Sequence, residues 1–135
     1  MRLITDDALG IITVWTEAEG EPYETKLGVS EAIRNRARLH VMSDGTIAGT
    51  VAKRYQFSAY NDNAQDNFRF IRALQLDSET PAVKDCAKAW DESATSLLVE
   101  GATHFYATTI PAPSWAATME FVGQYGKTRF YRSAA

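Results

Sequence analysis

The sequence predicts an α+β domain that is mostly helical and carries a small β element near its C-terminus. Apolar residues recur at helical spacing in three segments before residue 101. After this point the spacing changes to short extended segments. The length of 135 residues and the hydrophobic fraction of 45% are those of one globular domain. We therefore expect residues 1–135 to form a single domain.

The first helix is expected to start after Thr5, because threonine is a good N-cap residue. Asp6 and Asp7 then fall in the first turn, where the helix dipole favours negative charge. The helix should end near Gly20 or Pro22, because proline cannot continue a helix.

A second helix is predicted over residues 24–39. Its apolar face is formed by Val29, Ala32, Ile33, Arg36 and Ala37. The aliphatic stem of the arginine in this set can lie along that face while its charge points away. Residues 42–50 contain the turn signal Asp44-Gly45 and then a short apolar segment, and residues 55–67 are polar enough to form a loop.

The third helix is predicted over residues 80–100, with Thr80 as its cap, Pro81 in its first position and Gly101 after its end. Its expected buried stripe consists of Val83, Cys86, Ala87, Trp90, Ala94, Leu97 and Leu98. The single cysteine of the chain is part of this stripe, so we expect a buried thiol.

The C-terminal part is expected to hold the β element. Residues 102–106 form an extended segment, and residues 127–131 form a last strand. Between them, Pro111, Pro113 and Trp115 make a rigid loop that opens a short helix to Val122.

The charge and hydropathy pattern excludes several function classes. The formal net charge of −3 provides no positive surface for nucleic acid or anionic lipid, so we expect neither as a partner. No apolar stretch reaches the roughly 18 residues of a membrane span. Acidic residues follow the first few positions, which argues against a secretory signal.

The densest candidate for chemistry lies at the end of the first helix, where Glu17, Glu19 and Glu21 follow Trp15. A carboxyl group here can project into a cleft lined by aromatic side chains. Burial and like-charge neighbours raise a carboxyl pKa, which makes the group a proton donor near neutral pH. A solvated helix end has the same composition, however, because glutamates are usually exposed.

Further stretches occur in a recognisable order: E-A-E-G-E-P-Y-E from Glu17, V-S-E-A-I-R-N-R from Val29, Q-F-S from Gln56, G-A-T-H-F-Y from Gly101, P-S-W-A from Pro113 and G-K-T-R-F-Y-R from Gly126. Together they resemble the SleB-type cell wall hydrolases, the family of spore cortex-lytic enzymes. The chain departs from the family pattern at Glu19, Thr25 and Thr128, where the family has Arg, Gly and His. The first two differences are expected to change surface charge and loop shape, and the third removes any role of that His.

The resemblance implies a compact lysozyme-like fold and cleavage of the bond between N-acetylmuramic acid and N-acetylglucosamine. By analogy with lytic transglycosylases, Glu17 would protonate the glycosidic oxygen as the catalytic acid. It would then deprotonate the muramyl 6-hydroxyl, which closes a 1,6-anhydro ring without water or a cofactor. Glu17 is preferred to Glu21, because Glu21 precedes Pro22 and is expected to be exposed.

The candidate substrate-binding residues are Gln56, Ser58, His104, Tyr106, Trp115 and Glu21. The two aromatic residues of this set can stack on sugar rings. Each residue also has a structural interpretation: loop hydrogen bonds for Gln56 and Ser58, a strand position for His104 and a core position for Trp115.

Three other functions compete with this interpretation. A hydrolytic muramidase would need a second carboxylate, for which Asp62 or Asp66 is available. A zinc amidase would need three protein ligands, and the chain offers His40 and His104 with an acidic residue. A non-catalytic wall-binding module would keep the aromatic residues and would not need Glu17.

In its biological setting, the chain is expected to act as a monomeric phage endolysin. Such an enzyme is made in the host cytoplasm and reaches the periplasmic cell wall after a holin-like membrane protein has opened the inner membrane. A bacterial hydrolase stored in the cytoplasm, or a catalytic fragment, would have the same sequence features.

Overall fold

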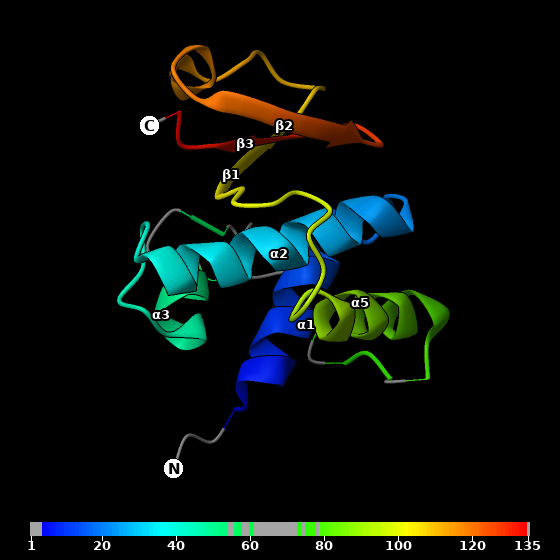
Figure 1. Cartoon of the computed structure of the whole chain (residues 1–135). Helices are drawn as coiled ribbons and strands as arrows, with labels where there is room; N and C mark the ends of the chain where they lie inside the picture. The colour runs from blue at the N-terminus through cyan, green and yellow to red at the C-terminus, as the bar shows by residue number, and fades with distance from the viewer. Residues whose placement is uncertain are drawn as a thin grey trace.

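The computed structural model describes residues 4–53, 56–57, 60, 73, 75–77 and 79–134. Its helices are α1 (Asp6–Ala18), α2 (Tyr23–Leu39), α3 (Ile47–Val51), α5 (Pro81–Glu92) and the short 3-10 helix η2 (Ser114–Ala117). Its strands are β1 (His104–Ala107), β2 (Glu120–Tyr125) and β3 (Thr128–Arg132). Figure 1 shows the sheet covering one side of α2, with α1, α3 and α5 packed on its opposite side. The predicted α+β fold with a small β element is confirmed.

Helix α1 begins as the sequence predicts. The Thr5 hydroxyl accepts a hydrogen bond from the amide of Ala8 at 3.1 Å, which satisfies one of the free donors of the first turn. The helix ends at Ala18. Its buried residues include Val14 and Trp15, so the last turn stands in the core and carries Glu17 at its edge.

Helix α2 is the central element of the domain. Its predicted apolar face is buried, but so is every residue from Thr25 to Ile33. The polar side chains in this stretch are bonded internally: Lys26 donates to the Glu21 carbonyl at 2.5 Å. The helix ends at His40, which has a left-handed φ of 55°. Because the sheet and the helices cover α2 from both sides, Thr25 is buried, whereas the sequence suggested a position that shapes the surface.

The predicted third helix is wrong in its second half, because α5 ends at Glu92 rather than at residue 100. Thr80 holds the cap position without a side-chain capping bond, and Pro81 is in the first turn. After the helix, the carboxylate of Glu31 accepts hydrogen bonds from the amides of Leu98 at 3.0 Å and Val99 at 2.8 Å, and from the Ser96 hydroxyl. These bonds replace the helical ones.

The expected buried stripe is therefore correct only up to the end of α5. Cys86 and Trp90 are fully buried, and burial raises the pKa of the Cys86 thiol to about 11. Beyond the helix, Ala94 is exposed and Leu97 is 69% exposed. Both side chains follow a turn that leaves the surface of α5.

The sheet is antiparallel with the strand order β1-β3-β2. Residues 104–107 of β1 pair with 128–131 of β3, close to the predicted extended segments. The predicted helix to Val122 is wrong: the helical turn ends at Ala117, and Val122 lies in β2. The pairing of β2 with β3 outweighs the weak helical preference of this short segment.

The core joins the helices to one face of the sheet. Its largest fully buried side chains include Trp90, Phe57, Phe130, Ile33 and Val14. Most of the expected loop 55–67, including Ser58, Asp62 and Asp66, lies outside the described residues. Phe57 is described and is 1% exposed, so this part of the chain contributes to the core.

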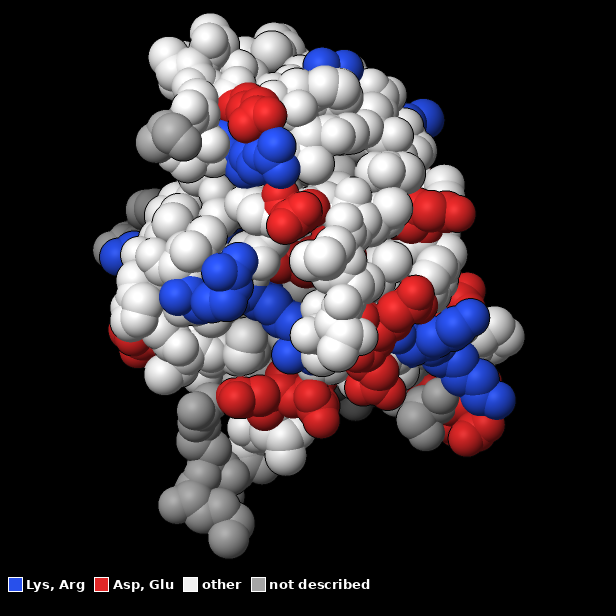
Figure 2. All heavy atoms as spheres, in the orientation of Figure 1, with Lys and Arg blue, Asp and Glu red and all other residues white. Residues whose placement is uncertain are grey.

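Charged side chains of both signs are mixed on the surface of the molecule. On the face drawn in Figure 2, the Lys and Arg side chains are intermixed with the Asp and Glu side chains, and neither positive nor negative residues form a separate patch. Among the described residues, no helix has both the length and the apolar character required to cross a membrane.

Candidate active site

A cleft with a volume of about 300 Å³ lies between the helical layer and the sheet. The helices contribute Glu17, Val29 and Arg36 to its lining. The other wall is formed by β1, by the loop that follows it and by η2, and it includes Tyr106 and Trp115. The sequence therefore brings together a carboxyl group, a guanidinium group and an aromatic wall from separate parts of the chain.

Glu17 stands in the last turn of α1 and is half-buried in the cleft. It is the only carboxylate among the described residues that line the cleft. The negative charge of Glu17 raises the pKa of Arg36, which burial lowers. It also raises the pKa of Tyr60, in the same direction as burial. Trp15 and Ala18 of the same helical turn are buried, so the position of Glu17 is set by the core.

Arg36 is 5% exposed and reaches the cleft from α2. Its Nε donates to the carbonyl of Thr103 at 2.6 Å, and its guanidinium carbon lies 5.0 Å from the centre of the Phe57 ring and 5.9 Å from that of Phe105. Burial lowers its pKa to about 10, and the charge of Glu17 acts in the opposite direction. Arg36 is therefore a cation at neutral pH.

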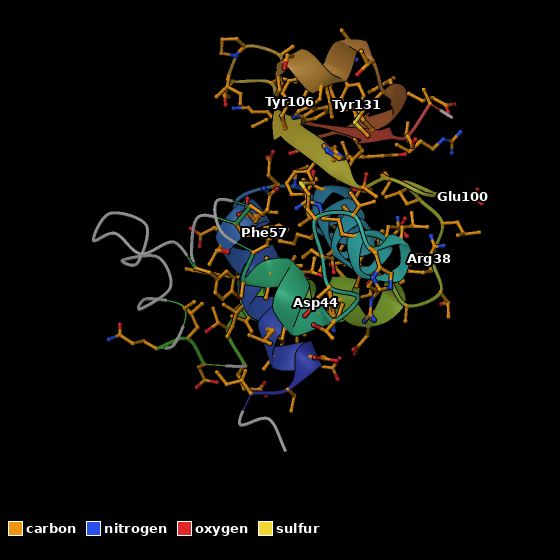
Figure 3. All side chains as sticks on the ribbon, turned by 90° about the vertical axis from the view of Figure 1, so that its left-hand side faces the viewer. Arg38, Asp44, Phe57, Glu100, Tyr106 and Tyr131 are labelled. Atoms are coloured by element: carbon orange, nitrogen blue, oxygen red, sulfur yellow. The ribbon has the colours of Figure 1, made fainter. Side chains whose placement is uncertain are left out.

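The sheet side of the cleft is an aromatic cluster. The rings of Tyr106 and Tyr131 stack with 5.9 Å between their centres, and Trp115 meets both edge-on at 5.9 and 5.3 Å. Figure 3 shows Tyr106 and Tyr131 in the sheet, and Phe57 on the side of the helices. An aromatic wall of this kind can bind the apolar face of a sugar ring.

The predicted substrate-binding residues divide into two groups. Gln56, Tyr106 and Trp115 line the cleft together with Glu17. His104 does not line it: its ring packs edge-on against Trp115 with centres 4.9 Å apart. Burial, with a smaller effect of the Arg36 charge, lowers the pKa of His104. The site therefore has His104 behind its aromatic wall, while Ser58 lies outside the described residues.

Glu21 lies beside the cleft rather than in its lining. Its carboxylate accepts a hydrogen bond from the amide of Lys127 at 3.2 Å, and the Thr128 hydroxyl is 3.5 Å from the same oxygen. Thr128 itself lines the cleft. Glu21 thus braces the turn between β2 and β3, and it is half-buried, whereas the sequence suggested that it is exposed.

Several lining residues were not identified as site residues from the sequence. They are Val29, Arg36, Phe105, Ala107, Ile110, Pro113 and Thr128. For Arg36 a signal exists, because a charged residue occurs between Ile33 and Ala37 on the apolar face of a helix, and charged residues are seldom fully buried without a partner. The others are apolar or small, and the sequence does not distinguish them from core residues.

A larger cavity of about 600 Å³ borders a different part of α2. It is lined by Arg34, Asn35, Arg38 and Glu100, and none of the predicted site residues reaches it. Arg34 donates to the Ser93 hydroxyl and the Trp90 carbonyl at 2.7 and 2.9 Å. The guanidinium of Arg34 thus binds other parts of the fold. We therefore assign the chemistry to the smaller cleft, which contains Glu17.

Among the described residues, no group of three or more His, Cys, Asp or Glu side chains is arranged to hold a metal ion. His40 caps α2, whereas His104 supports Trp115. The ligand set that a zinc amidase would need is therefore not formed by these two histidines in the described part of the chain.

Comparison with known proteins places these features in context. A family model described as Cell Wall Hydrolase matches residues 20–131, so Glu17 precedes the matched stretch. A spore cortex-lytic enzyme from Oceanobacillus iheyensis is 28% identical over 117 residues, which are 87% of this chain and 38% of the relative. The chain thus spans well under half the length of that relative.

Two solved structures have the same fold. One is the catalytic domain of the germination-specific lytic transglycosylase SleB from Bacillus anthracis, with a TM-score of 0.69, 20% identity and coverage of 94% of this chain and 93% of the other. The other is the catalytic domain of the Bacillus cereus SleB protein, with a TM-score of 0.70, 20% identity and coverage of 94% and 89%. The expected similarity to the SleB fold is confirmed.

Proposed function

The chain belongs to the family of cell wall hydrolases, and on this premise we propose that it is a peptidoglycan lytic transglycosylase. It cleaves the glycan strand between N-acetylmuramic acid and N-acetylglucosamine. The observation that carries the proposal is the cleft: Glu17 is its only carboxylate among the described lining residues, and an aromatic wall faces it. A single carboxyl group is sufficient for a reaction in which the substrate supplies its own nucleophile.

In the first step, the Glu17 carboxyl group gives its proton to the glycosidic oxygen as the bond from that oxygen to the muramyl C1 breaks. In the second step, the 6-hydroxyl oxygen of the same sugar bonds to C1, and its proton passes to the Glu17 carboxylate. The product is a 1,6-anhydro sugar, and Glu17 is again protonated. The nucleophile is part of the bound sugar, so its attack is effectively intramolecular.

The other cleft residues support binding and orientation. Tyr106 and Trp115 offer ring faces and edges for a pyranose, and Gln56 offers an amide that can donate to and accept from sugar hydroxyl or acetamido groups. Because Trp115 packs on His104 and Tyr131, its ring is held in place before the sugar binds. Such preorganisation reduces the entropy lost on binding.

The proposal is tested by mass spectrometry of the muropeptides that wild-type protein and Glu17→Gln release from purified peptidoglycan. We expect anhydromuramyl ends with the wild type and none with the variant, which cannot donate the proton. Glu21→Gln is the matched control, because it lies four positions away and outside the cleft lining; it should keep the anhydro product.

Hydrated muramyl ends would instead indicate a hydrolytic muramidase, with Glu17 as its acid and a second carboxylate about 5–9.5 Å away. The sequence candidates for that role, Asp62 and Asp66, lie outside the described residues. Free stem peptides would mean that the bond is an amide. Full activity of Glu17→Gln would mean that this residue has no chemical role.

The finer biological role also remains a proposal. We infer from the sequence that the chain acts as a monomeric endolysin, which is made in a host cytoplasm and reaches the wall with the help of a holin-like protein. Membership of a cell wall hydrolase family supports the target. Expression in a bacterial host with and without a holin tests it: lysis should require both proteins. Sedimentation velocity of the purified protein tests the monomer.

A further inference from the structure

Arg36 is the second charged residue among the described residues that line the cleft, and it is held by the core. It is 5% exposed. Its Nε–H is bonded to the Thr103 carbonyl at 2.6 Å, and its guanidinium packs against the rings of Phe57 and Phe105. These contacts come from the segment before β1, from β1 itself and from the chain after α3. The position of the positive charge is therefore set by the fold.

One nitrogen of this guanidinium makes no hydrogen bond to the residues that the structure describes. Its Nη1 is buried and has no hydrogen-bond partner among the residues that the structure describes. A buried N–H without a partner is costly in a folded protein, so each such group calls for an explanation. Arg36 lines the cleft together with Glu17, and the charges of the two groups interact. We therefore expect the group that the Nη1 of Arg36 interacts with to lie in the cleft.

We propose that Arg36 is a positioning residue whose fixed positive charge stabilises the Glu17 carboxylate at the moment when Glu17 gives up its proton. This inference rests on the proposed function. Before the transfer, Glu17 is neutral and its attraction to Arg36 is weak. During the transfer, negative charge develops in a cleft with apolar walls, where water screens it poorly and an oriented cation is most effective. The stabilisation is thus greater in the transition state than in the bound state.

The other titratable groups that the structure describes around this pair do not provide such a charge. Tyr106 lines the cleft and Tyr60 interacts with the charge of Glu17, but the ordinary pKa of tyrosine is about 10, so both are neutral at neutral pH. His104 faces Arg36 from β1, and burial favours its neutral form. Helix α3 has no titratable side chain, and the buried titratable group of α5 is the Cys86 thiol.

The pH dependence of kcat/KM reports this interaction. The rate falls at alkaline pH when Glu17 loses its proton in the free enzyme. A nearby cation favours the carboxylate, so removing it moves the alkaline limit to higher pH. For Arg36→Gln we expect a shift of about one pH unit upward, with a maximal rate lower by about tenfold or more. Arg36→Lys keeps the charge, and its alkaline limit should move by about half that amount or less.

Arg34→Gln is the matched control. Arg34 is on the same helix and donates to a backbone carbonyl and a serine hydroxyl, but it does not line the Glu17 cleft. Its loss should reduce thermal stability and leave the alkaline limit of kcat/KM unchanged. If Arg36→Gln does not fold, citrulline at position 36 replaces it, because this neutral residue keeps the shape of arginine and the N–H that binds Thr103.

An unchanged alkaline limit in the neutral variants, with a raised KM, would overturn the proposal and make Arg36 a substrate-binding residue. Equal shifts in Arg36→Lys and Arg36→Gln would also overturn it, because they would indicate a change in geometry. These outcomes are separate from a failure of the proposed function, which would appear in the wild type as products other than cleaved glycan. They are also separate from activity that survives Glu17→Gln.

Discussion

Replacing Glu31 by alanine should destabilise the domain far more than its place on a helix suggests. The side chain is 3% exposed. One oxygen accepts from the Val99 amide at 2.8 Å and the other from the Leu98 amide at 3.0 Å, and the Ser96 hydroxyl adds a third bond. In Glu31→Ala all three donors lose their acceptor at once, and alanine supplies no substitute.

The size of the effect follows from the environment of each donor. Val99 is fully buried, whereas Leu98 and Ser96 are half-buried and can regain part of their loss from water. With about 1–3 kcal/mol for each buried donor left unsatisfied, the free energy of unfolding should fall by about 3 kcal/mol. For a domain of this size, that corresponds to a lower Tm by about 10 °C. It is a large share of a typical stability of about 5–15 kcal/mol.

Urea unfolding followed by circular dichroism gives the free energy directly. Glu31→Gln keeps one carbonyl acceptor and should lose about half as much as alanine. Glu24→Ala is the matched control, because Glu24 is exposed in the first turn of the same helix; it should cost about 1 kcal/mol or less. If Glu31→Ala unfolds within about 1 kcal/mol of the wild type, the turn at residues 96–99 is held by other contacts and the reasoning fails.

Three further predictions concern packing, pH and the thiol. A Cβ on Gly28 would lie 2.5 Å from the Phe130 ring, so Gly28→Ala should push the sheet away from α2. The free energy of unfolding in urea should fall by about 1–3 kcal/mol, and muropeptide release should decrease. Unchanged activity would mean that the sheet adapts. The pKa of His104 is lowered by burial, so its contribution to stability is fully present above the unfolded pKa of about 6.5 and is lost as pH falls toward the folded pKa. The Tm of His104→Gln should therefore fall less than that of the wild type between pH 7.5 and pH 5.5 (about one unit either side of that pKa), and equal falls would contradict this. Burial raises the pKa of Cys86 to about 11, so a thiol reagent at pH near 8 should modify the denatured but not the native protein; rapid native labelling would refute the burial.

The sequence predicted the elements whose signals are local. The start of α1 depends on the Thr5 cap and two acidic residues, and the structure has that cap. The start of α5 depends on Pro81. The extended segments near the C-terminus become β1 and β3 with small shifts in their ends. In each case the residues that determine the element are within one or two turns of it.

The errors arise where a distant residue decides. The segment after Glu92 has helical spacing, but Glu31 accepts hydrogen bonds from a hydroxyl and two amides of this segment, which lie 65–68 positions away. Val122 follows a helical turn, yet its segment becomes a strand because β3 offers an open edge. No local pattern contains either partner, so single-residue propensities could not reveal the outcome.

The same distinction applies to the site. Glu17, Gln56, Tyr106 and Trp115 were identified from the sequence and meet in one cleft. Arg36 was interpreted as a residue whose stem covers apolar surface, and the role of its guanidinium depends on Thr103, which lies 67 positions away. Recognition of this group therefore required the fold.

The turn between β2 and β3 has a mechanical consequence for the cleft. It is fastened to the corner between α1 and α2, where Glu21 accepts from Lys127 and the Thr25 hydroxyl donates to the Tyr125 carbonyl at 2.8 Å. A Cβ on Gly126 would come within 2.8 Å of Pro22, so the two parts are in close contact. The sheet is thus anchored to the helices at the end that carries this turn. If the cleft widens to admit a bulky polymer, we expect the sheet to rotate about this anchored end and the cleft to open at the opposite end.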